Sequence, residues 1–304
     1  MSNYPHPLAE TSPDNQAKNL SKSDQPGELF VVATPIGNLA DITFRAIETL
    51  KQVNLIAAED TRHIKMLMQH YGISNKLTSM HEHNEDSMAI SLLEKLRAGQ
   101  SIALVSDAGT PLLNDPGMPL VKLAKESGIR VTPIPGACAA IAALSVAGLP
   151  VTGFTFEGFS PRTSSGRKSF FNERLQRTTT WIFYESSHRI LASLQDMAEI
   201  LPLDRQIVIA REMTKLHETI IKASVADVLE LVTEDSNMRK GEFVVLVQGA
   251  KPADQDLTPE EEHILKVLLK QCSIKTAVSL AVEITGARKK RLYQAALTIQ
   301  EIAE

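Results

Sequence analysis

Three turns in the first half of the sequence combine a glycine with a proline directly after an apolar run. They read T-P-I-G-N at 34–38, S-D-A-G-T-P at 106–111 and P-I-P-G-A at 133–137. Glycine lets a backbone approach a ligand closely, and proline makes a turn rigid. In open parallel α/β sheets, ligands bind outside the carboxyl ends of the strands. The three turns therefore predict one preformed ligand site, although each turn alone is also compatible with a tight connection between a strand and a helix.

The middle turn is the centre of this predicted site. An apolar run at 102–105 suits a strand that is covered on both faces, and Asp107 and Gly109 follow where the strand ends. The helix expected after 133–137 leaves its first amides free for an anion or a carboxylate. The sequence contains neither a Walker lysine nor a G-x-G-x-x-G motif, which disfavours P-loop NTPases and standard dinucleotide-binding folds.

The elements that must position these turns alternate regularly from 28 to 150. Strands are expected at 29–34, 53–58, 76–80, 102–105 and 129–134, and a helix is expected after each. Five such units predict a first α/β domain with a mostly parallel five-stranded sheet and right-handed crossovers.

The pattern changes after residue 150. Two consecutive strands at 206–210 and 219–223 have no helix between them, which predicts a second α/β domain with a mixed sheet over 151–249. A linker is expected at 250–259, and three helices are expected in a small module at 260–304. The segment at 1–27 is expected to be disordered.

Composition indicates an ordinary globular protein. The chain has 304 residues, a formal net charge of −4 and two cysteines, Cys138 and Cys272. That spacing predicts neither a disulfide framework nor a metal site, and it fits a reducing cytoplasm. We expect no secretory signal and no membrane span. The net charge does not indicate a nucleic-acid binder, so that role would require local basic patches.

Taken together, several motifs resemble the tetrapyrrole-methylase superfamily, and most closely its ribosomal RNA branch, the small-subunit cytidine 2′-O-methyltransferases. They are V-V-A-T-P-I-G-N-L, A-A-E-D-T-R, S-D-A-G-T-P, P-I-P-G-A, F-E-G-F-S-P, F-Y-E-S-S-H-R and A-R-E-M-T-K-L-H-E, in this order along residues 28–300. The resemblance implies two α/β domains with S-adenosylmethionine in the cleft between them, a homodimer, and small-subunit ribosomal RNA or the assembled subunit as substrate. Ser187 stands where that branch is expected to have proline.

The resemblance also implies which residues hold the cofactor. Pro35 and Gly37 would line the cleft through their backbones, the middle turn would contact the methionine and ribose end, and the third turn would close over the cofactor. The implied set from the last two turns is Asp107, Ala108, Gly109, Thr110, Pro111, Pro135, Gly136 and Ala137.

Methyl transfer to a ribose hydroxyl needs in-line positioning and a group that removes the hydroxyl proton. Glu212 is the preferred base, with Arg211 and Lys215 as electrostatic partners, because they are expected at a strand end of the second domain. A structural ion-pair network, or charge that faces RNA, is the alternative. Asp60 and Arg62 are further polar candidates, or else a helix N-cap and its neutralising partner.

RNA binding needs positive charge, and two basic stretches supply it. The first, at 162–177, interleaves cations with Phe170 and Phe171, and the second opens the last expected helix after a Thr285–Gly286 turn. A solvated helix face with core phenylalanines, and a helical packing or dimer element, are the respective alternatives. The predicted RNA-binding residues are Arg162, Arg167, Lys168, Arg174, Arg288, Lys289, Lys290 and Arg291.

Two other functions compete with an RNA methyltransferase. A tetrapyrrole C-methyltransferase would share the cofactor site, but it would not need the basic helical module at the end of the chain. A non-enzymatic RNA-binding module would keep the basic surfaces without needing a methyl donor.

Overall fold

The computed structural model describes residues 25–250 and 257–303. Most of the segment expected to be disordered, and most of the expected linker, lie outside the described residues. The described chain divides into two compact units between Ala139 and Ala140. The sequence predicted this boundary at residue 150. Because the observed boundary lies earlier, the helix α5 (Ala139–Val146) groups almost entirely with the second unit rather than with the first.

The first unit contains the predicted five-stranded parallel sheet, in the order β3-β2-β4-β1-β5. Its central strand β4 is buried along its whole length, which explains the uninterrupted apolar run in the sequence. The strands are β1 (Leu29–Val32), β2 (Leu55–Ala58), β3 (Leu77–Ser79), β4 (Ile102–Val105) and β5 (Val131–Ile134).

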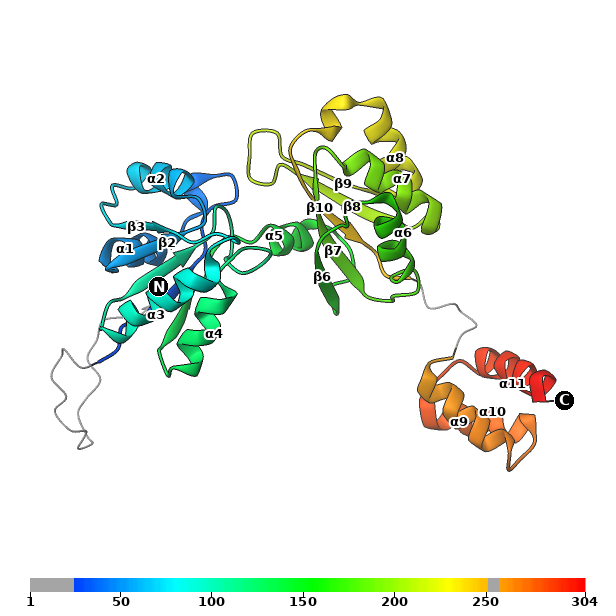
Figure 1. The fold of residues 1–304 in the computed structure, drawn as a ribbon. Coiled ribbons are helices and arrows are strands. Elements are labelled where there is room, and N and C mark those ends of the chain that lie inside the picture. Colours follow the sequence, from blue (N-terminus) through cyan, green and yellow to red (C-terminus); the bar gives the residue numbers. More distant parts are fainter. Residues whose placement is uncertain (1–24, 251–256, 304) are drawn as a thin grey trace, which may run out of the picture. The chain divides into compact units, whose positions relative to one another are not determined.

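Helices cover both faces of this sheet (Figure 1). Buried side chains of α1 (Phe44–Gln52) and α2 (Thr61–His70) form one core with the strands, and those of α3 (Glu85–Arg97) and α4 (Met118–Glu126) form another. A short 3-10 helix, η1 (Leu39–Asp41), follows β1. The sheet is therefore doubly wound, and the carboxyl ends of its strands share one edge.

The second unit contains the predicted mixed sheet, in the order β6-β7-β10-β8-β9. The pair β6–β7 is parallel, and the remaining pairs are antiparallel. The aromatic side chains of Phe170, Phe171, Trp181 and Phe183 lie in the core between this sheet and its helices. The strands are β6 (Phe154–Phe159), β7 (Thr180–Ser186), β8 (Gln206–Arg211), β9 (Thr219–Ser224) and β10 (Glu242–Val247), and the helices are α6 (Ser164–Asn172), α7 (Ile190–Ile200), α8 (Val225–Glu234) and the 3-10 helix η2 (Ser236–Arg239).

Three helices follow residue 256, as predicted: α9 (Pro259–Leu269), α10 (Ile274–Thr285) and α11 (Lys289–Ala303). They have a core of their own, in which Leu265 meets Ala277, Ala281 and Leu292. Gly286 ends α10 in the left-handed conformation, with φ of 69°, which is the turn expected between the last two helices. Across the described residues, no helix has the length and apolar character that a membrane span needs.

Candidate functional site

The carboxyl edge of the first sheet brings the three glycine- and proline-containing turns together. Thr34 and Gly109 exchange backbone hydrogen bonds of 2.9 and 3.0 Å, which join the turn after β1 to the turn after β4. The Thr110 hydroxyl donates a hydrogen bond to the carbonyl of Ala137 (3.0 Å), which joins the turn after β4 to the turn after β5. These turns are therefore one connected surface, as a preformed ligand site requires.

Two glycines in these turns are required by their surroundings. Gly109 has φ of +83°, a conformation that side chains disfavour, and a Cβ there would lie 3.2 Å from the Ile36 side chain. A Cβ on Gly136 would lie 2.9 Å from the Cβ of Ala33. The backbone of Gly136, which is exposed, can therefore pass over the end of β1 only because it has no side chain.

Asp107 is tied to the neighbouring turn after β2. Its Oδ1 accepts a hydrogen bond from the backbone N–H of Asp60 (2.8 Å), and its Oδ2 lies 3.2 Å from Nδ1 of His63. Asp60 is the N-cap of α2, and its carboxylate accepts hydrogen bonds from the Arg62 backbone and guanidinium. The N-cap interpretation of Asp60 and Arg62 is therefore confirmed, and the hydrogen bonds from Arg62 lower the pKa of Asp60.

Two further carboxyl groups at this edge have raised pKa values. Burial, and then the negative charges of Asp107 and Asp115, raise the pKa of Glu59. Burial also raises the pKa of Asp115, although a hydrogen bond with Ser106 opposes the shift. Half-buried acids without a cation to balance them are costly, and such groups cluster at functional sites.

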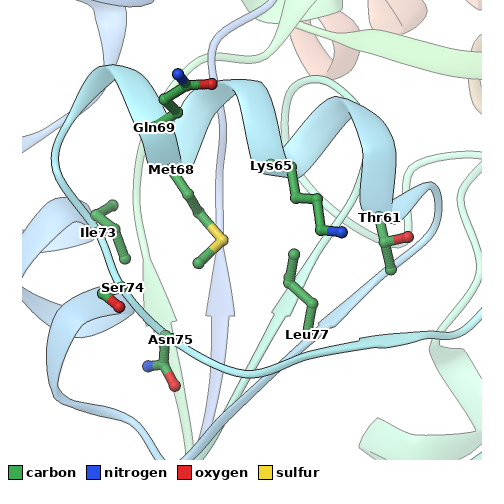
Figure 2. A pocket seen from close by; sticks show the side chains of 8 residues that line it. All are labelled: Thr61, Lys65, Met68, Gln69, Ile73, Ser74, Asn75 and Leu77. Carbon is green, nitrogen blue, oxygen red and sulfur yellow. The ribbon is translucent and has the colours of Figure 1, made fainter.

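A hollow of about 420 Å³ lies elsewhere in the first unit, between α2 and the segment that leads into β3. Figure 2 shows its lining side chains, which come from the helix, from that segment and, with Leu77, from the start of β3. It contains none of the predicted cofactor residues, and the Asn75 amide group at its rim is already bound to the carbonyls of Leu50 and Val53. We assign no ligand to this hollow, because the predicted cofactor residues lie in the turns at the carboxyl edge and not here.

In the second unit, the predicted catalytic residues lie at the end of β8 and in the turn that follows. The Arg211 side chain is buried, and its guanidinium donates hydrogen bonds to the carbonyls of Lys240 (2.6 Å) and His217 (3.1 Å). Lys215 donates to the carboxylates of Glu212 (2.9 Å) and Glu242 (2.8 Å). The structure thus brings the three residues together, but as a network in which Arg211 braces the β8–β9 turn.

Glu212 has a strained backbone conformation, and one of its carboxylate oxygens accepts two hydrogen bonds. Its φ is +50°, and its Oε1 accepts hydrogen bonds from Lys215 and from the backbone N–H of Glu242 (3.0 Å). Gly241 is required opposite it, because a Cβ there would lie 2.5 Å from the Glu212 carboxyl group. Burial alone would raise the pKa of Glu212, but these hydrogen bonds and the charges of Lys215 and Arg211 outweigh burial and lower it.

Two of the predicted RNA-binding arginines in the first basic stretch are structural, so that part of the prediction is wrong. Arg167 is 5% exposed and forms an ion pair of 2.7 Å with the buried Asp196. The Arg174 guanidinium pairs with Glu157 at 2.6 Å and lies over the Phe170 ring. A guanidinium that is buried against a carboxylate is not available to a phosphate, and Phe170 itself belongs to the core.

The other predicted RNA-binding residues differ in their surroundings. Lys168 is half-buried and pairs with Glu199 at 2.5 Å, and Arg291 pairs with Glu261 within the C-terminal helices. Arg162 is exposed and has no ion pair among the described residues. The start of α11 presents a second exposed basic surface, formed by Arg288, Lys289 and Lys290.

Sequence reasoning missed His63 altogether. The residue lies in the first turn of α2, and its partner Asp107 follows another strand. The sequence could have indicated His63, because it follows an expected helix N-cap, and that position lies at the same sheet edge as the other turns.

Comparison with known proteins gives consistent matches for both parts of the chain. Residues 28–229 match the family described as Tetrapyrrole (Corrin/Porphyrin) Methylases, and residues 255–300 match the RsmI C-terminal HTH domain. The ribosomal RNA small subunit methyltransferase I of Escherichia coli O157:H7 is 51% identical over 283 residues, which are 93% of this chain and 99% of that protein. The protein of the same name from Haemophilus influenzae is 48% identical over 274 residues, 90% of this chain and 97% of its own length.

A solved structure agrees with the fold. The uroporphyrin-III-C-methyltransferase from Thermus thermophilus superposes with a TM-score of 0.53 and 18% identity, covering 73% of this chain and 94% of that one. At this identity the likeness concerns the fold alone.

Proposed function

Since the chain belongs to the tetrapyrrole methylase family, we propose that it is an S-adenosylmethionine-dependent methyltransferase that acts on the ribose 2′-hydroxyl of a cytidine in small-subunit ribosomal RNA. The observation that carries the proposal is the match over nine-tenths of the chain to proteins named ribosomal RNA small subunit methyltransferase I, including the C-terminal helices. The cytidine and the 2′-oxygen come from the motif resemblance in the sequence.

The carboxyl edge of the first sheet fits the methyl donor. The exposed backbone of Gly136 is accessible to a ligand, and the carboxyl groups of Glu59, Asp107 and Asp115 suit a positively charged sulfonium group. When bound, S-adenosylmethionine supplies a methyl group that is already activated for transfer. We propose that the holding residues are Pro35, Gly37, Asp107, Ala108, Gly109, Thr110, Pro111, Pro135, Gly136 and Ala137.

RNA would be bound by the exposed cations. Arg162 and the start of α11 offer side chains that a phosphate backbone can reach, and such contacts supply most of the sequence-independent affinity for nucleic acid. The three-helix module resembles the helix-turn-helix arrangement, in which a helix N-terminus contacts the nucleic acid. A homodimer in the cytoplasm, where small subunits are assembled, completes the proposal.

The proposal is tested by methyl transfer from labelled S-adenosylmethionine. Small subunits from cells that lack this protein should accept label from the purified protein, and subunits from wild-type cells should accept little because their site is already modified. The label should map to a ribose. Equal labelling of both kinds of particle, or label on a base, would contradict the proposal. Calorimetry should also detect donor binding, and its absence at millimolar donor would exclude a methyltransferase altogether.

A further inference from the structure

The first turn of α2 carries a histidine in an arrangement typical of acid–base chemistry. His63 Nδ1 faces Oδ2 of Asp107 at 3.2 Å, and the other carboxylate oxygen is fixed by the backbone N–H of Asp60. The His63 side chain is 57% exposed, and among residues 25–250 and 257–303 its Nε2 has no hydrogen-bond partner. One ring nitrogen is therefore held by a carboxylate, while the other is presented to the surroundings.

We propose that His63, oriented by Asp107, is the base that accepts the proton of the ribose 2′-hydroxyl. This inference rests on the function proposed above. A carboxylate that accepts a hydrogen bond from Nδ1–H fixes the tautomer in which Nε2 is the acceptor, and it stabilises the imidazolium that forms. Asp107 follows the central strand, so the pair lies at the same edge as the turns proposed to hold the donor.

The reaction balances with these groups alone and a sulfonium methyl donor. The 2′-hydroxyl oxygen forms a bond to the methyl carbon, and its proton passes to Nε2 of His63. The bond between carbon and sulfur breaks, and its electron pair stays on sulfur, which becomes a neutral thioether. The imidazolium then releases its proton to water.

His63 is better suited to this role than Glu212. The Glu212 Oε1 already accepts two hydrogen bonds, and the lowered pKa of this carboxyl group makes it a weaker base, whereas Nε2 of His63 has no hydrogen-bond partner among the described residues. The charged groups that interact with His63 are Asp107 from the end of β4 and Asp60, the N-cap of its own helix. Asp60 is neutralised by Arg62, which leaves Asp107 to orient the ring.

A first test reads the tautomer without any turnover. Nitrogen NMR of histidine-labelled protein should show that the neutral ring of His63 has its proton on Nδ1 and none on Nε2, assigned by the loss of this signal in His63→Gln. In Asp107→Asn, the asparagine oxygen can still accept the Asp60 N–H, but its amide N–H faces Nδ1 and should reverse the tautomer. The same tautomer in both proteins would refute the orienting role.

A second test separates the base from a structural residue. His63→Ala and His63→Gln should lower kcat by about 100-fold or more, the typical contribution of a general base. Calorimetry should give unchanged affinity for S-adenosylmethionine, and melting should give an unchanged midpoint. Added imidazole should restore part of the activity of His63→Ala. His70→Ala is the matched control, because His70 is an exposed histidine in the last turn of the same helix.

Each outcome decides between the possibilities. Activity of His63→Ala close to that of the wild type would refute the inference but leave the proposed function standing. Normal kcat with weakened donor affinity would make His63 a binding residue, which also refutes it. A wild-type protein that binds the donor but transfers nothing to ribosomal RNA would overturn the proposed function, and the inference with it.

Discussion

The ion pair between Arg167 and Asp196 offers the sharpest test of which cations face RNA. Both side chains are nearly inaccessible, with 6% and 7% of their surfaces exposed. Asp196 accepts hydrogen bonds from the Arg167 Nε (2.7 Å) and the Ser164 hydroxyl (2.6 Å), and Arg167 also donates to the carbonyl of Arg162 (2.8 Å). Removing one partner leaves the other as a buried charge without its counter-ion.

The expected cost follows from these contacts. Asp196→Ala should lower the free energy of unfolding by about 3–5 kcal/mol, the usual result of leaving a buried guanidinium unpaired. Arg167→Ala should lie near the lower end of that range, because Ser164 and Lys168 still lie close to Asp196. The double variant should fall short of the summed single costs by about 1–3 kcal/mol, because the two charges lose the same interaction.

Urea unfolding measures these energies, and filter binding to a small-subunit RNA fragment measures affinity. Arg162→Ala is the matched control, because Arg162 is exposed in the segment just before the same helix. It should weaken RNA binding and leave unfolding unchanged. The reasoning would be refuted if Arg167→Ala unfolded like the wild type while its RNA affinity fell.

Three further predictions concern the two proposed binding surfaces. The raised pKa of Glu59 means that its ionised form costs folding free energy, and this cost grows as pH rises through the ordinary glutamate range. Glu59→Gln should therefore raise the melting temperature at pH 7, and it should weaken binding of the cationic donor in calorimetry. Gly136→Ala places a methyl group 2.9 Å from a side chain at the end of β1, so donor affinity should fall by about tenfold or more while RNA affinity is retained. The double variant Lys289→Ala/Lys290→Ala should weaken RNA binding and reduce the slope of log affinity against log salt concentration by about 1.4–1.8. Lys266→Ala removes a cation that is paired within α9, so it should change neither the affinity nor the slope.

The order of elements and both sheets could be predicted from the sequence because their signals are local. The buried run at 102–105 and the glycines that end the neighbouring helices depend on a few adjacent residues. The mixed sheet followed equally from the absence of a helix between β8 and β9. The unit boundary could not be predicted in this way, because whether α5 packs with the first or second unit depends on tertiary contacts.

Charge partners account for the errors in the site. The stretch at 162–177 contains many cations and a single acid, so it suggested a free basic surface. The acids that neutralise it come from other elements: Glu157 precedes the stretch and Asp196 lies in α7. Likewise, nothing beside His63 in the sequence indicates Asp107, which lies 44 residues later. When the two members of an ion pair or hydrogen bond come from different helices or strands, their roles can be assigned only once the fold is known.

The β8–β9 turn shows why position at a strand end does not by itself identify a base. Glu212 and Thr214 both have positive φ, at 50° and 64°, and such strain persists only where the surroundings hold it in place. Here Arg211 holds the turn through the carbonyls of Lys240 and His217, and the Glu212 carboxylate accepts hydrogen bonds from Lys215 and from the backbone of Glu242. A carboxylate with these hydrogen bonds stabilises the conformation of the turn and is poorly placed to accept a proton from a substrate. Glu212→Gln should therefore lower stability above the ordinary glutamate pKa, where the ionised carboxylate contributes, and this difference from the wild type should fade as pH falls through the lowered pKa.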